Sequence, residues 1–142
     1  MARPHKRYSV RKSPECRDAE RGSKLPQVFL VGDSSEDEEL LYSLFRRKKI
    51  RVFATGIGPS RKLLEKPGGV ALVKRLHDRG LVVHAYTLRA DRVRSEYASH
   101  EAEIEAFLTR YAVDGVFTDY PDRSAKWLSR KRAISTAKDR EQ

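Results

Sequence analysis

Cysteine is almost absent from this sequence, and long apolar runs are absent altogether. The single cysteine, Cys16, excludes a disulfide within the chain and any zinc site built from several of its own cysteines. No stretch approaches the roughly 18 consecutive apolar residues that a membrane-spanning helix needs, so no membrane span is expected. The first residues lack the apolar segment of a secretory signal peptide. We therefore expect no signal peptide, and the cytoplasm is the default compartment.

The positive charge of the chain is unevenly distributed. Its 142 residues include 30 Lys and Arg against 20 Asp and Glu, a net charge of +10. Residues 1–24 contribute +5 and residues 129–142 contribute +3, which leaves +2 for residues 25–128. Charge concentrated in the ends is weak evidence that the folded part binds a polyanion. We predict a disordered basic arm over 1–25, a folded domain over 26–128 and a charged tail over 129–142.

Short apolar runs alternate with helical patterns along the folded part. Strands are expected at residues 27–31, 50–54, 81–86 and 116–118, and a helical pattern follows each of them. Ser34 or Ser35 together with Glu38 has the spacing of a capping box, which predicts that a helix begins there. Alternation of this kind implies parallel strands joined by right-handed crossovers. Both a doubly wound domain and half of an eight-stranded barrel fit this pattern.

Polar or glycine residues follow the expected strands. Parallel strands bring their carboxyl ends to one edge of a sheet, where α/β folds keep their sites. The residues expected to gather on that edge are Asp33, Gly58, Tyr86, Arg89 and Asp119. Gly56 and Gly58 are interpreted as parts of a tight turn after the strand at 50–54, because glycine adopts positive φ at little cost.

Three motifs together resemble those of a known enzyme family. They are TGIGP at 55–59, GLVVHAYTLR at 80–89 and VDGVFTDYPDRSAKWL at 113–128. In their order and spacing they resemble the C-terminal half of glycerophosphodiester phosphodiesterases (GDPD family). The resemblance implies four parallel β/α units forming the C-terminal half of a TIM (β/α)8 barrel. It also implies hydrolysis of glycerophosphodiesters to sn-glycerol 3-phosphate and an alcohol, with a divalent metal, Ca²⁺ or Mg²⁺.

The catalytic motifs of that family do not occur in this sequence. Its histidines and metal-binding carboxylates come from an H-R-G motif and an E-x-D motif, and neither is present in the 142 residues. Thr55 and Ala85 also depart from the aspartate and proline that are common there. The expectation is therefore a truncated family member that is inactive by itself, with no catalytic residue and with its metal ligands unassigned. Tyr86, Arg89 and Asp119 remain as substrate-binding candidates.

Two other functions are compatible with the sequence. A small basic α/β module that binds nucleic acid is the first, although the charge distribution predicts no specific nucleic-acid partner. The second is a half-barrel that pairs with another chain. Because strands cut from a closed barrel leave two unpaired edges and an uncovered inner face, self-association is expected. Phe53, Val83 and Phe117 are candidates for that uncovered surface.

Overall fold

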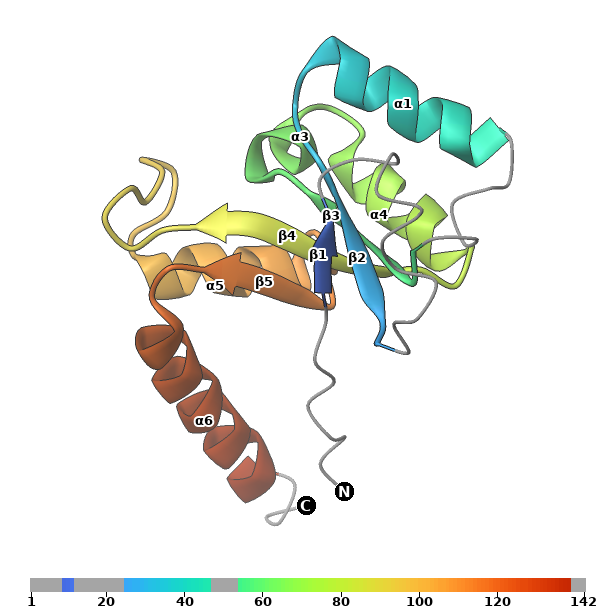
Figure 1. Cartoon of the computed structure of the whole chain (residues 1–142). Coiled ribbons are helices and arrows are strands. Elements are labelled where there is room, and N and C mark those ends of the chain that lie inside the picture. The colour runs from blue at the N-terminus through green and yellow to red at the C-terminus, as the bar shows by residue number, and fades with distance from the viewer. Residues whose placement is uncertain (1–8, 12–24, 47–53, 139–142) are drawn as a thin grey trace.

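The computed structural model of the chain describes residues 9–11, 25–46 and 54–138, and the side chains of residues 25–46 and 54–133 (Figure 1). The strands are β1 (Ser9–Arg11), β2 (Gln27–Val31), β3 (Gly56–Pro59), β4 (Val82–Leu88) and β5 (Gly115–Thr118). The helices are α1 (Ser35–Arg46), α3 (Arg61–Glu65), α4 (Gly69–His77), α5 (His100–Thr109) and α6 (Pro121–Lys138).

All five strands are parallel and follow one another in the sheet in chain order, β1-β2-β3-β4-β5. A doubly wound sheet reverses its strand order at a switch point, and this sheet has no reversal. The two neighbours of β4 also begin at different points along it. The first residue of β3, Gly56, pairs with Val82, whereas the first residue of β5, Gly115, pairs with His84. Stagger of this kind is what barrel closure requires. The prediction of four parallel β/α units from a barrel is confirmed.

A serine caps the amino-terminal end of three of the helices. Ser60 accepts a hydrogen bond from the Leu63 amide at the start of α3, and Ser99 accepts one from the Ala102 amide at the start of α5. At α1, Ser34 Oγ accepts from the Asp37 amide and donates to Asp37 Oδ2, at 3.1 and 2.8 Å. The start of this helix was therefore predicted correctly, but Asp37 takes the part expected of Glu38.

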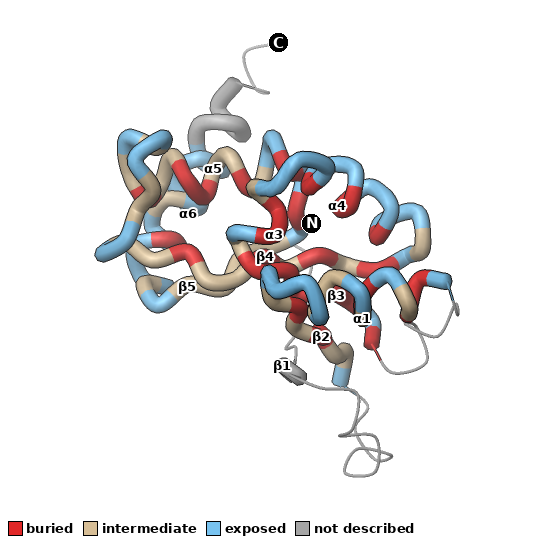
Figure 2. Tube along the Cα trace, turned by 90° about the horizontal axis from the view of Figure 1, so that it is seen from above, coloured by how far each residue is buried: buried red, intermediate tan, exposed pale blue. Residues whose placement is uncertain are grey.

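One face of the sheet packs against the helices and forms the core. Figure 2 shows buried residues along the strands and on the helix sides that face them. The strand residues of this core are Phe29, Val31, Ile57, Val83, Ala85 and Leu88, and the largest helix residues are Leu41, Phe45, Leu64, Leu76, Ile104 and Phe107. Val83 is 0% exposed, so its prediction as uncovered surface is wrong. It points toward the helices rather than toward the barrel interior.

The opposite face of the sheet corresponds to the interior of a barrel. This face carries Val28, which is fully buried, and four half-buried residues, Leu30, Val82, His84 and Phe117. The His84 and Phe117 rings meet edge to face with their centroids 5.9 Å apart. Phe117 is therefore partly uncovered, as predicted. Phe53 lies outside the described residues.

Glycine gives this inner face the space that its larger side chains fill. A Cβ atom on Gly56 would lie 2.4 Å from Val82 Cγ2, and one on Gly58 would lie 2.5 Å from Leu30 Cδ2. Both glycines belong to β3, so the prediction of a turn at this point is wrong. The strand expected at 50–54 lies outside the described residues except for Ala54, which is buried and precedes β3.

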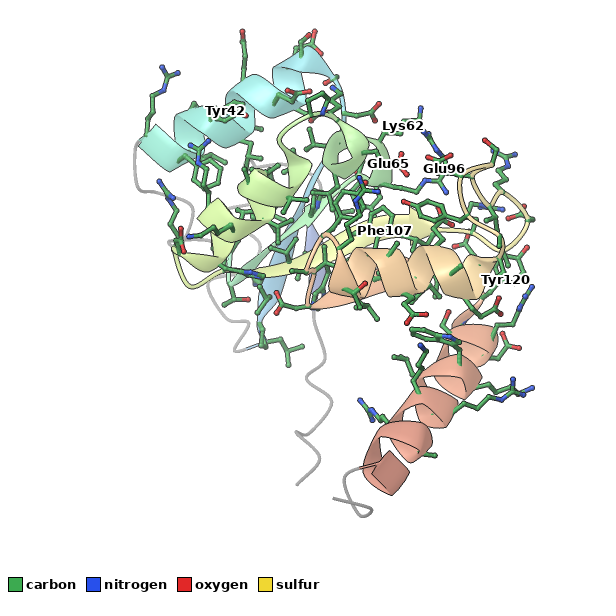
Figure 3. The ribbon with its side chains drawn as sticks, turned by 180° about the vertical axis from the view of Figure 1, so that it is seen from behind. Tyr42, Lys62, Glu65, Glu96, Phe107 and Tyr120 are labelled. Carbon is green, nitrogen blue, oxygen red and sulfur yellow. The ribbon has the colours of Figure 1, made fainter. Side chains whose placement is uncertain are left out.

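The two ends of the chain contain more regular structure than expected. β1 lies within the segment predicted to be a disordered arm, where it pairs in parallel with β2. The remainder of residues 1–24 lies outside the description. Helix α6 continues beyond residue 128 to Lys138, through most of the predicted tail, and projects away from the sheet (Figures 1 and 3). None of the helices in the described part combines the length and apolar character required to cross a membrane.

Candidate functional site

Polar side chains meet where parallel strands β4 and β5 end. Arg89 directly follows β4 and Asp119 directly follows β5. Arg89 Nη1 donates a hydrogen bond to Asp119 Oδ2 at 2.6 Å, and both side chains are about half exposed. Two of the three substrate-binding candidates are thus in direct contact, although they are 30 residues apart in sequence.

Asp91 holds the same guanidinium from a second side. Arg89 Nε donates to Asp91 Oδ1 and Nη2 donates to Asp91 Oδ2, both at 3.0 Å. Such a bidentate pair fixes the plane of the guanidinium. The hydrogen bonds and charge of Asp91 raise the pKa of Arg89, and the hydrogen bonds from Arg89 lower the pKa of Asp91. Asp91 lies in a polar stretch that carried no sequence signal.

Tyr86 lies in β4 and is half-buried. Burial is the main cause that raises the pKa of its phenol, and the charges of Asp37 and Asp33 raise it further. At neutral pH the hydroxyl therefore keeps its proton and can donate a hydrogen bond. Because β2, β3 and β4 are parallel neighbours, the end of β2 lies on the same edge of the sheet as the end of β4. Asp37 was foreseen only as part of an acidic first helical turn.

The five residues expected on one rim do not all follow a strand end. Asp33, Arg89 and Asp119 follow strand ends, and Tyr86 lies in the later part of β4. Gly58 also lies inside its strand, one residue before the end of β3, so the expectation that each of the five follows a strand end was wrong for Gly58 and for Tyr86. The residue that follows β3 is Ser60, which bridges to Tyr86 and brings the start of α3 to the rim.

The loop over residues 89–99, which we call the β4–α5 loop, lies beside a group of buried charges. Arg61 on α3 donates to Glu103 Oε1 on α5 at 2.8 Å, and Glu103 is fully buried. Arg94 on the loop lies 3.2 Å from Glu65 Oε2 on α3 and donates to Glu96 Oε1 at 3.1 Å. Figure 3 shows Glu65 and Glu96 at the same end of the molecule.

Two carboxylates in this group are incompletely hydrogen-bonded. Neither oxygen of Glu65 accepts a hydrogen bond from the protein, and the same holds for Glu103 Oε2. Burial raises the pKa of both groups, and the nearby arginines oppose that shift without cancelling it. The ion pair between Arg94 and Glu65 is therefore close in distance but poorly aligned, and it does not compensate for the desolvation of Glu65.

Replacing Glu65 by glutamine is expected to stabilise the protein at neutral pH. The pKa of Glu65 in the folded protein is raised above 4.5. Its contribution to the free energy of unfolding is therefore most favourable below pH 4.5, where the carboxyl is neutral, and becomes unfavourable as the pH rises through the folded pKa and the buried group ionises. Glu65→Gln should therefore increase the free energy of unfolding by about 1 kcal/mol at pH 7, and the difference should vanish toward pH 4. Chemical denaturation between pH 4 and 8 measures it.

Glu96→Gln is the matched control, because Glu96 shares Arg94 with Glu65. A backbone hydrogen bond and the hydrogen bond from Arg94 lower the pKa of Glu96, so its contribution is present above pH 4.5 and is lost as the pH falls through the folded pKa. This variant should be less stable than the parent at pH 7. If Glu65→Gln instead proves less stable than the parent at neutral pH, the ion pair with Arg94 outweighs the desolvation.

Comparison with known proteins adds to this geometry. Residues 6–123 match the model of the glycerophosphoryl diester phosphodiesterase family. The chain belongs to this family. A glycerophosphodiester phosphodiesterase from Haemophilus influenzae is 32% identical over 84 residues, which cover 54% of this chain and 23% of that relative. The match thus spans about a quarter of the length of the relative.

Membership of the glycerophosphoryl diester phosphodiesterase family explains why polar residues follow β4 and β5. The family is a TIM barrel, and such barrels carry their sites at the carboxyl ends of the strands. It is also generally metal-dependent. Among residues 25–46 and 54–133, however, no group of three or more His, Cys, Asp or Glu side chains is arranged to hold a metal ion. Asp91 and Asp119 do not fit a site for Ca²⁺ or Mg²⁺, because both carboxylates bind Arg89.

Proposed function

We propose that this chain provides the substrate-binding rim of the C-terminal half of a glycerophosphodiester phosphodiesterase. The reaction is hydrolysis of a glycerophosphodiester to sn-glycerol 3-phosphate and an alcohol. The contact between Arg89 and Asp119 carries the proposal, because it joins the ends of two strands that both carry motifs of the family. The substrate is then a small molecule that occupies the carboxyl-end rim.

Each of the three residues has a distinct role in this proposal. Arg89 has more N–H donors than its contacts with Asp91 and Asp119 use, and those that remain bind a phosphate oxygen. Asp119 accepts a hydrogen bond from a glycerol hydroxyl with its second oxygen. Tyr86, which keeps its proton at neutral pH, donates to a substrate oxygen. All three bind and orient the substrate, and none of them supplies the metal or an acid–base pair.

The alternative, a module that binds nucleic acid, has less support from the geometry. Phosphate recognition requires basic side chains that are free to contact the nucleic-acid backbone. Several arginines of the described part instead hold carboxylates of the chain itself, namely Arg61, Arg89, Arg94 and Arg123. We therefore propose a small-molecule substrate and no specific nucleic-acid partner.

Binding of sn-glycerol 3-phosphate, measured by isothermal titration calorimetry, tests this function. Arg89→Lys keeps the charge but loses the bidentate geometry, and Asp119→Asn removes the anionic acceptor. Each is expected to weaken binding about tenfold or more, the cost of one hydrogen bond to a charged group. Arg110→Lys is the control, because Arg110 lies at the opposite end of α5 with its guanidinium over Tyr111. Equal affinities for the parent chain and for both rim variants would contradict the proposal.

A further inference from the structure

The β4–α5 loop is exposed at several positions yet is tied to the body of the protein by buried charge. We propose that Arg61 is a positioning residue that holds this loop in place, so that Asp91 keeps the Arg89 guanidinium at the rim. Arg61 belongs to α3 and touches neither Arg89 nor Asp119 in any hydrogen bond of the described residues. The purpose assigned to the loop rests on the proposed function, but the anchoring itself does not.

The contacts of Arg61 join three separate segments. Its Nη1 donates to the backbone carbonyl of Arg92 in the loop at 3.2 Å and to Glu103 Oε1 on α5 at 2.8 Å. The side chain of Arg61 is 17% exposed and that of Glu103 is 0% exposed. Because a buried carboxylate requires a charged partner, Glu103 fixes where the guanidinium lies. The guanidinium in turn fixes the loop carbonyl.

The anchored carbonyl is adjacent to the residue that holds Arg89. Arg92 follows Asp91 directly, and Asp91 makes the bidentate contact with the Arg89 guanidinium. A displacement of the Arg92 backbone therefore moves the Asp91 carboxylate. A misplacement of about 1 Å is enough to disrupt a site whose geometry depends on bidentate contacts.

Two backbone hydrogen bonds, from the Arg92 amide to the Arg89 carbonyl and from the Tyr97 amide to the Arg94 carbonyl, close turns within the loop, whereas Arg61 ties the loop backbone to the body of the protein. Arg94 pairs with Glu65 and Glu96, and the Tyr97 phenol interacts electrostatically with Tyr111. Both arise from the second half of the loop, beyond Arg92. In the first half, the side-chain contact with the loop backbone comes from Arg61. Loss of Arg61 should consequently loosen the segment that carries Arg89 and Asp91 first.

The test is hydrogen–deuterium exchange measured by mass spectrometry on the full chain. In the double variant Arg61→Met with Glu103→Met, apolar side chains replace a buried ion pair, a change that is often neutral for stability. It nevertheless removes the donor to the Arg92 carbonyl. We expect exchange of the peptide over residues 89–99 to rise about tenfold, while peptides over β4 and α4 keep their protection. Arg61→Lys should give a smaller rise in the same peptide.

The matched control replaces Arg123 and Glu101, which pair at 3.0 Å between α6 and α5, with methionine. This control should leave exchange of the 89–99 peptide unchanged. Three results would overturn the proposal. They are unchanged exchange of the 89–99 peptide in the Arg61 and Glu103 variant, an equal rise in exchange of the β4 and α4 peptides, and an equal rise in exchange of the 89–99 peptide in the control.

Affinity for sn-glycerol 3-phosphate separates this inference from the proposed function. The double variant keeps Arg89. If the loop positions Arg89, the affinity of this variant for sn-glycerol 3-phosphate should nevertheless fall about tenfold. A loosened loop with unchanged affinity overturns the positioning role. A parent chain that binds no sn-glycerol 3-phosphate contradicts the proposed function, whereas the exchange of the loop still decides whether Arg61 anchors it.

Discussion

Purified 142-residue protein is expected to release no sn-glycerol 3-phosphate from glycerophosphocholine, with or without added Ca²⁺ or Mg²⁺. Cleavage of a phosphodiester at neutral pH requires a cationic clamp for the developing charge and a positioned acid–base pair. Asp91 and Asp119 neutralise the charge of Arg89, so its remaining N–H donors orient a phosphate oxygen without supplying this clamp, and neither an H-R-G nor an E-x-D motif occurs in the sequence. Because enzymes of this kind accelerate their reactions at least about a million-fold, the difference from an active enzyme is large.

A coupled assay for sn-glycerol 3-phosphate measures this, and the Haemophilus influenzae relative is the positive control. Metal-dependent release by the purified chain would contradict the prediction. A variant that combines Arg89→Met with Asp119→Asn separates true activity from contamination. Release that disappears in this variant belongs to the chain, whereas release that persists comes from another enzyme.

The second large effect concerns the stability of the chain in isolation. In the described part, β1 and β5 each have one neighbouring strand, so both edges of the sheet present unpaired backbone groups. The inner face carries Leu30, Val82 and Phe117, which are half-buried rather than fully exposed. If they leave roughly 200 Å² of apolar area uncovered, burying it would contribute about 5 kcal/mol, which is comparable with the lower limit of domain stability.

We therefore expect the chain to self-associate through this sheet and to melt at a temperature that rises with protein concentration. Phe117→Gln should weaken the association, because it places a polar group on the inner face. Leu128→Gln is the control, since Leu128 is 37% exposed on α6, the helix that projects away from the sheet (Figure 1). Calorimetry at several concentrations measures both variants, and equal effects of the two would show that the inner face is not the surface involved.

Strands rich in β-branched and aromatic residues were predictable from sequence, and the glycine-containing strand was not. β2, β4 and β5 coincide with apolar runs that predict buried strands. β3 reads Gly-Ile-Gly-Pro, a composition typical of turns. It forms a strand because its glycines leave space for Val82 and Leu30 on the neighbouring strands. That requirement arises from contacts between strands, which the local sequence of β3 does not reveal.

The short strand β1 was missed for a related reason. Its three residues lie in a polar segment, and its conformation depends on pairing with the edge of β2. Helix starts were easier to predict, because a serine cap acts within a few residues. Even there, the choice of Asp37 over Glu38 as the partner of Ser34 depends on the geometry of the first turn.

The candidate site was predictable only where a motif marked it. Arg89 and Asp119 follow strands, and parallel geometry alone brings their side chains together. Asp91 and Arg61 gave no such signal, because one lies in a polar loop and the other at the start of a short helix. The partner of Arg61 in the core, Glu103, is 42 residues away. Contacts over such distances depend on how the helices pack against the sheet.

The mass of the chain in solution tests most directly whether the sheet is an open part of a barrel. Sedimentation velocity over a range of micromolar concentrations should show species larger than the 16.3 kDa chain, in proportions that increase with concentration. Dilution should shift the distribution toward the monomer. A single 16.3 kDa species at every concentration, together with a sharp thermal transition independent of concentration, would mean that the five strands form a self-sufficient fold and would contradict the account.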